Sequence, residues 1–145
     1  MNILDYIIIA FCLMELSNVF ILYFKPKFKY GNGIAVFDSY KSSEGKKDIH
    51  LFVNYLKNWV ANVKLIFIVL LFVIVLKGSD ELKVYATIVL IASIFVYYIS
   101  LHPIIKELDR MGKISPKGYS KTLFWMITGF IAMFTIGLIL YFVIG

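Results

Sequence analysis

Cysteine, proline and acidic side chains are scarce in this chain of 145 residues, which has one cysteine, three prolines and nine Asp and Glu residues. Because Cys12 has no second cysteine to pair with, an intramolecular disulfide, a CxxC redox pair and a cysteine zinc cluster are excluded. Neither histidine belongs to an HExxH motif, and the sequence lacks phosphate-binding loops, dinucleotide fingerprints and nucleophile elbows. We therefore expect no catalytic residues, no metal and no cofactor.

Long hydrophobic runs dominate what is present. Hydrophobic residues make up 61% of the chain and charged residues 17%, whereas soluble domains average roughly 45–50% and 25%. Four runs are each about long enough to cross a hydrocarbon layer of ~30 Å as a helix. They are Ile3–Phe24, Trp59–Leu76, Val84–Leu101 and Leu123–Ile144. The sequence predicts an all-α fold, an integral membrane four-helix transmembrane bundle, with residues 1–145 as a single domain.

Prolines, glycines and capping residues set the expected helix ends. Pro26 ends the first helix, Asp48 is a suitable N-cap for the second, and Pro103 is expected to kink the third. Ser115–Pro116 has the form of a helix start. The expected helices cover residues 3–24, 48–76, 80–111, with the kink near 102–103, and 116–144, and residues 25–47 form a connecting loop.

The net charge of +6 is unevenly distributed along the chain. Twelve of the fifteen Lys and Arg residues lie in or beside the connections that precede the second and fourth helices. Positively charged loops remain in the cytoplasm. We therefore expect both termini to be extracytoplasmic and loops 25–47 and 102–121 to be cytoplasmic. Membrane topology accounts for the positive charge, so we expect no nucleic acid partner.

Lysines alternate with aromatic residues directly after the first helix. Lys25, Lys27 and Lys29 are interleaved with two phenylalanines and one tyrosine. Aromatic rings and ammonium groups suit the headgroup layer of a membrane. We expect these lysines to contact anionic lipid, with membrane lipids as partners of the protein. A specific anionic ligand at the same lysines is the alternative.

Glu15 is the most unusual residue, because it places a carboxylate near the middle of the first predicted helix, roughly 13 Å from the helix end. Lys64 lies roughly 7–8 Å inside the second hydrophobic run, measured from the same side of the membrane. Its long side chain spans the remaining difference in depth to Glu15. Three amides and one imidazole are expected at the same end of the bundle. The predicted intramembrane polar cluster consists of Glu15, Asn18, Asn58, Asn62, Lys64 and His102.

Two interpretations of this cluster remain open. A buried ion pair with amides can fix the register of packed helices, and an intramembrane acid can also titrate or bind a ligand. The first, which we favour, predicts a small non-enzymatic membrane protein with a structural, binding or accessory role, as a homo-oligomer or in a larger membrane complex. The second predicts a proton-coupled transporter or channel-like protein that uses Glu15 and Lys64. A membrane enzyme acting on lipid-derived substrates, with His102 as acid or base, is a third alternative.

Overall fold

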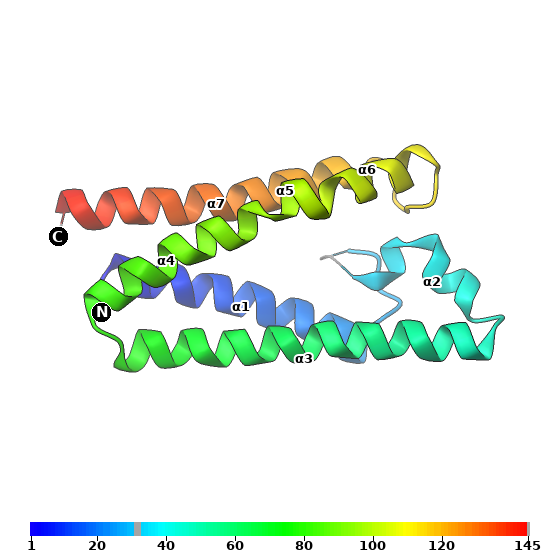
Figure 1. The fold of residues 1–145 in the computed structure, drawn as a ribbon, viewed down its shortest axis with the longest axis horizontal. Helices are drawn as coiled ribbons and strands as arrows, with labels where there is room; N and C mark the ends of the chain where they lie inside the picture. Colours follow the sequence, from blue (N-terminus) through cyan, green and yellow to red (C-terminus); the bar gives the residue numbers. More distant parts are fainter. Residues whose placement is uncertain (31–32, 145) are drawn as a thin grey trace.

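A computed structural model describes residues 1–30 and 33–144 of the chain. These residues form an all-helical fold with four helices long and apolar enough to span a membrane. The four spans are α1 (Ile3–Phe24), α3 (Lys47–Lys77), the broken helix Asp80–Arg110 and α7 (Tyr119–Ile144), as Figure 1 shows. The prediction of an all-α, multi-pass membrane four-helix bundle is confirmed.

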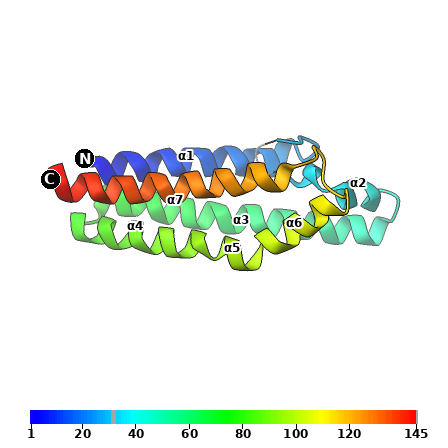
Figure 2. The same cartoon turned by 90° about the horizontal axis from the view of Figure 1, so that it is seen from above.

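The bundle has two different ends. Both termini and the short turn at Gly78–Ser79 lie at one end, here named the terminal end (Figures 1 and 2). The connections 25–46 and 111–118 lie at the opposite end, here named the loop end. Between these ends α1 contacts each of the other spans, namely α3, α4 (Asp80–Phe95) and α7. The first helix is therefore central to the packing.

Aromatic packing joins α1 to α7 in the middle of the bundle. The ring of Phe11 meets those of Phe130 and Phe134 edge to face, at centroid distances of 5.2 and 5.1 Å. Such pairs stabilise a packed core beyond the area that they bury. Nearer the terminal end, Gly137 lets α7 approach α1 closely, because a Cβ atom at this position would overlap with Cδ1 of Ile7.

Local sequence explains both ends of α1. The Asn2 side chain accepts hydrogen bonds from the backbone amides of Leu4 and Asp5. The Asp5 carboxylate accepts one from the backbone amide of Asn2 at 2.7 Å. This reciprocal capping box satisfies amides that the first helical turn leaves without partners. At the other end the helix stops at Phe24, and Lys25 is its C-cap. Pro26 follows and disfavours helical geometry in its predecessor.

The third span breaks earlier than the predicted kink at 102–103. It consists of α4, α5 (Tyr97–Ser100) and α6 (His102–Arg110), with interruptions at Val96 and Leu101. Pro103 lies in the first turn of α6 and has no amide hydrogen for the carbonyl one turn before it. In addition, the Ser100 hydroxyl donates to the Val96 carbonyl at 2.9 Å, a side-chain bond that bends helices. Both effects act upstream of the proline.

The two connections at the loop end pair with each other. The first contains η1 (Ile34–Val36) and α2 (Asp38–Ser43), while residues 31 and 32 of the predicted loop 25–47 lie outside the described residues. The Asp38 amide donates to the Lys113 carbonyl at 3.0 Å, and the Ser115 amide donates to the Val36 carbonyl at 2.9 Å. These bonds place the first and third connections side by side at the loop end.

The last helix begins at Tyr119, three residues after the predicted start at 116. Gly118 has a φ of +83°, a left-handed conformation that does not continue into a right-handed helix. Asp109 of α6 caps the helix instead of Ser115, because its carboxylate accepts the Gly118 amide at 2.9 Å and the Ser120 amide at 3.0 Å. The cap therefore comes from the preceding span and attaches α6 to α7.

Candidate functional site

Glu15 and Lys64 meet between α1 and α3. The Lys64 Nζ atom lies 2.5 Å from Oε2 of Glu15 and 2.8 Å from Oδ1 of Asn18. Asn18 is almost one helical turn after Glu15, so both groups present their oxygens to one side of α1. The side chain of Lys64 is 18% exposed and that of Glu15 is 15% exposed. We name Glu15, Asn18 and Lys64 the central polar triad.

The triad compensates its own charges. An ammonium group removed from water requires acceptors for its three N–H bonds, and a carboxylate requires donors. The Lys64 ammonium donates to the charged carboxylate of Glu15 and to the neutral side-chain carbonyl of Asn18, both on α1. Glu15 in turn has the ammonium as its donor. Charge-assisted hydrogen bonds of this kind are short and strong. The arrangement can hold α1 and α3 at one relative depth.

The structure does not bring the other two predicted amides to Lys64. At about 100° per residue, Asn58 lies about 120° and Asn62 about 160° around α3 from Lys64. Both amides are on exposed positions, and the Asn62 carbonyl accepts a hydrogen bond from the Tyr23 hydroxyl instead. The expected depth of these residues was compatible with the cluster, but their angular position was not.

His102 also lies outside the triad. Its ring packs against those of Tyr97, Tyr98 and Phe124, at centroid distances of 5.8, 6.5 and 5.1 Å. The physical reason is the course of the third span, because α6 contacts α7. Figure 1 shows α4 leaving α3 at the terminal end and crossing toward α7. His102 therefore joins side chains of α5 and α7, a group that is separate from the central polar triad.

Two grooves reach the triad from different sides. Glu15 and Asn18 line a groove of about 500 Å³ between α1 and α7, whose opposite wall includes Trp125 and Met133. Asn18 and Lys64 line a smaller groove of about 240 Å³ where α1 and α3 meet η1. Asn18 is common to both grooves. The ion pair thus lies between two hollows of the surface.

A second ion pair lies at the terminal end, where the sequence analysis did not expect one. Nζ of Lys83 on α4 is 2.8 Å from Oδ1 of Asp5, an ionic contact whose geometry falls outside that of a regular hydrogen bond. Asp5 is fully buried and the Lys83 side chain is 9% exposed. The same depth argument that relates Glu15 to Lys64 relates Asp5 to Lys83, since both lie about one turn inside helices that begin at the same end.

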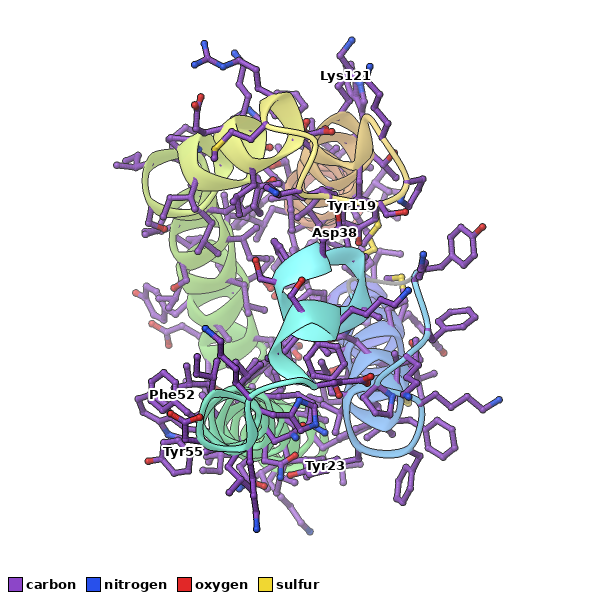
Figure 3. The ribbon with its side chains drawn as sticks, turned by 90° about the vertical axis from the view of Figure 1, so that its right-hand side faces the viewer. Tyr23, Asp38, Phe52, Tyr55, Tyr119 and Lys121 are labelled. Carbon is purple, nitrogen blue, oxygen red and sulfur yellow. The ribbon has the colours of Figure 1, made fainter. Side chains whose placement is uncertain are left out.

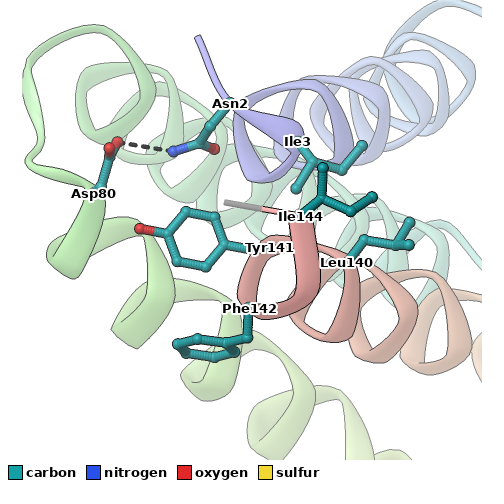
Figure 4. Close-up of a pocket in the computed structure, with 7 residues that line it drawn as sticks. All are labelled: Asn2, Ile3, Asp80, Leu140, Tyr141, Phe142 and Ile144. Atoms are coloured by element: carbon teal, nitrogen blue, oxygen red, sulfur yellow. Dashed lines mark hydrogen bonds between the residues drawn. The ribbon is translucent and has the colours of Figure 1, made fainter.

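The Asp5–Lys83 pair is connected to the rim of the terminal end. Asp80 lies 3.4 Å from the Lys83 ammonium and accepts a hydrogen bond from the Asn2 side chain at 2.8 Å. Figure 4 shows this Asn2–Asp80 bond beside Tyr141, within a pocket of about 680 Å³. The terminal end therefore has its own polar network joining α1 and α4.

The lysines predicted to contact lipid are exposed at the loop end. Lys25, Lys27 and Lys29 are all on exposed positions after α1. Lys27 pairs with Glu44 at 3.3 Å, and both of these side chains are exposed. An exposed pair of this kind contributes little to stability. Among the described residues, no group of three His, Cys, Asp or Glu side chains is placed to hold a metal ion.

Comparison of the chain with protein-family models, with curated proteins and with solved structures finds no match in any of the three. The two ion pairs, the grooves and the loop end are the features of the molecule that bear on its function.

Proposed function

We propose that this protein is a non-enzymatic membrane protein with a structural, binding or accessory role, acting as a homo-oligomer or as a subunit of a larger membrane complex. The observation that supports the proposal is the use of the buried charges. Glu15 pairs with Lys64 and Asp5 pairs with Lys83, so each of these two acids joins α1 to a neighbouring span.

The two pairs together restrain α1 in the way that a structural role requires. Asp5 and Glu15 are ten residues apart, which corresponds to about 15 Å along a helix. One pair holds α1 against α4 near the terminal end, and the other holds it against α3 toward the loop end. Restraints at two depths limit both sliding and rotation of α1, an attested use of buried polar groups. Such a rigid bundle suits a protein that presents fixed surfaces to partners.

A proton-coupled transporter or channel-like protein is the second candidate, favoured by the two grooves that reach Asn18 from different sides. In that case Glu15 would exchange protons and Lys64 would be its counter-charge. Four spans would then need to oligomerise to enclose a pathway.

The substitution Glu15→Gln separates these two functions. The structural role predicts that this variant lowers thermal stability or changes the assembly size, with no pH-dependent uptake of any ion in proteoliposomes of either protein. Glu81→Gln is the matched control, because Glu81 is an exposed acid at the terminal end. An acid pulse applied outside vesicles that contain a pH-sensitive dye measures proton uptake. Native mass spectrometry measures the copy number of the assembly. Proton uptake by the parent that Glu15→Gln abolishes while the protein stays folded would contradict the structural role.

We also propose that the loop end faces the cytoplasm and that both termini are extracytoplasmic. The pairing of the first and third connections supports this, because it gathers the two lysine-rich segments on one side, and lysine-rich loops remain inside.

Cysteine labelling tests this orientation. In a Cys12→Ser background, Lys41→Cys places a thiol on α2 at the loop end and Glu81→Cys places one at the terminal end, both on exposed positions. A membrane-impermeant maleimide added to intact cells is expected to label the Glu81→Cys protein, and to label the Lys41→Cys protein only after permeabilisation. The opposite pattern would reverse the orientation.

A further inference from the structure

A cationic groove lies between α6 and α7 at the loop end, apart from both ion pairs. It has a volume of about 440 Å³. Two rows of residues line it, each with a spacing of four: His102, Lys106 and Arg110 from α6, and Lys117, Lys121 and Trp125 from the start of α7 and the loop before it. Residues four apart share one face of a helix, which applies to the three residues of α6 and to Lys121 and Trp125 of α7, while Lys117 lines the groove from the loop before α7. The two rows therefore face each other across the groove.

The groove carries more positive charge than the protein itself compensates. Lys106, Lys117 and Lys121 have no ion-pair partner among the described residues, whereas Arg110 pairs with Glu107 at 3.0 Å. The acid inside the groove is Asp109, which accepts hydrogen bonds from the Gly118 amide and from the amide and hydroxyl of Ser120 and whose negative charge also attracts Lys117. The three unpaired lysines outnumber this one carboxylate, and the excess of positive charge favours an anion in the hollow.

The walls of the groove are held in place. Asp109 is buried and fixes the end of α6 to the first turn of α7 through three hydrogen bonds. Below the cations, the rings of His102 and Phe124 are in contact at 5.1 Å. The lysines therefore stand on a scaffold that keeps the two rows together without a ligand.

The groove changes character along its length. The cations occupy its outer part, near the loop, and Trp125 and Phe124 form its inner part. Lys121 and Trp125 are four residues apart on α7, about 6 Å along the helix axis. Trp125 is 69% exposed although it is large and apolar, and tryptophan prefers the boundary between headgroups and hydrocarbon. Figure 3, which views the loop end, shows Lys121 at the edge of the bundle, pointing outward.

We propose that this groove binds the phosphate-bearing headgroup of an anionic membrane phospholipid, with the lysines on the phosphate and Trp125 and Phe124 against the glycerol and the first carbons of the acyl chains. Basic hollows between membrane helices are suited to such headgroups. Free phosphate shares the charge of this ligand but has no apolar part to meet the aromatic floor. The combination of cations above rings therefore favours a lipid.

Quenching of Trp125 fluorescence by brominated lipid measures lipid contact at the inner part of this groove, and variants of the groove lysines separate it from contact at the groove of Glu15 and Asn18, which Trp125 also lines. In a Trp59→Phe background, Trp125 is the remaining tryptophan, and Trp59 is itself exposed and contacts Tyr55. The protein is reconstituted in phosphatidylcholine, and brominated phosphatidylglycerol or brominated phosphatidylcholine is titrated in. We expect the phosphatidylglycerol to be preferred about fivefold or more, since each lysine near the surface contributes about that factor.

Paired variants assign this preference to the groove. Lys106→Gln with Lys121→Gln removes two charges inside it and is expected to reduce the preference to less than about twofold. Lys41→Gln with Lys47→Gln removes two exposed charges elsewhere at the loop end and is expected to retain the preference. Lys106→Arg with Lys121→Arg keeps the charge and should also retain it. If the double glutamine variant does not fold, Lys121→Gln alone is expected to lower the preference about fivefold, the factor that one lysine contributes.

Three results would overturn the proposal. One is a preference that is unchanged in the folded groove variants. Another is an equal loss in the groove variant and the Lys41/Lys47 control, which would indicate general attraction to the surface. The third is displacement of the brominated lipid by millimolar inorganic phosphate, which would indicate an ion site.

Discussion

Lys83→Met is expected to destabilise the protein more than any other single substitution of a charged residue. The substitution leaves the fully buried Asp5 carboxylate without its cation. Removing one member of a buried ion pair costs about 3–5 kcal/mol of folding free energy, because the remaining charge stays uncompensated. Denaturation of the purified protein by an ionic detergent, followed by circular dichroism, measures the loss. Helix α4 should separate from α1 first.

Two further variants show whether the isolated charge causes this loss. Asp5→Asn combined with Lys83→Met removes both charges and should restore most of the lost free energy, since the amide still caps the first turn of α1. Asp80→Asn is the matched control, because Asp80 also lies near Lys83 but is 61% exposed. It should cost less than about 1 kcal/mol. Equal effects of Lys83→Met and Asp80→Asn would show that burial of Asp5 is unimportant.

Lys64→Met is expected to cost about 2 kcal/mol of folding free energy, less than Lys83→Met because its pair is partly exposed. Glu15 and Asn18 lose their common donor in this variant. The expected consequence is a loosened contact between α1 and α3 and a lower midpoint in the same detergent titration. Native mass spectrometry should show whether the copy number changes at the same time.

Lys77→Met is the control for this second substitution. Lys77 is the last residue of the same helix and is exposed. Surface substitutions of this kind change stability by less than about 0.5 kcal/mol. If Lys77→Met and Lys64→Met had the same effect, the loss would come from shortening a lysine on α3, whatever its contacts.

Hydropathy and depth were sufficient to predict most of this fold and part of its polar interior. The length of the apolar runs defines four spans, and a rise of about 1.5 Å per residue places Glu15 and Lys64 at matching depths. Depth alone does not show which side of a helix a residue faces, so its angular position must also be compared. Asn58 and Asn62 lie about 9 Å and about 3 Å along α3 from Lys64, but the helical rotation of about 100° per residue turns both away from the Lys64 side chain, and Asn62 bonds to Tyr23 of α1 instead.

Other features depend on packing that local patterns do not encode. The third span crosses from α3 to α7, and this course separates His102 from the triad. The pair of Asp5 with Lys83 could have been found by comparing depths at the terminal end as well. The cap of α7 by Asp109 joins residues nine and eleven apart across a loop, so a search of neighbouring residues points to Ser115 instead.

The coupling energy between Glu15 and Lys64 tests most directly whether their ion pair holds α1 in the bundle. A double-mutant cycle with Glu15→Gln, Lys64→Met and the combined variant gives this energy from the free energies of unfolding. Residues in direct contact couple by about 0.5–3 kcal/mol, and we expect about 1 kcal/mol or more in favour of the pair. Single losses that add up within about 0.3–0.5 kcal/mol in the combined variant would contradict the account.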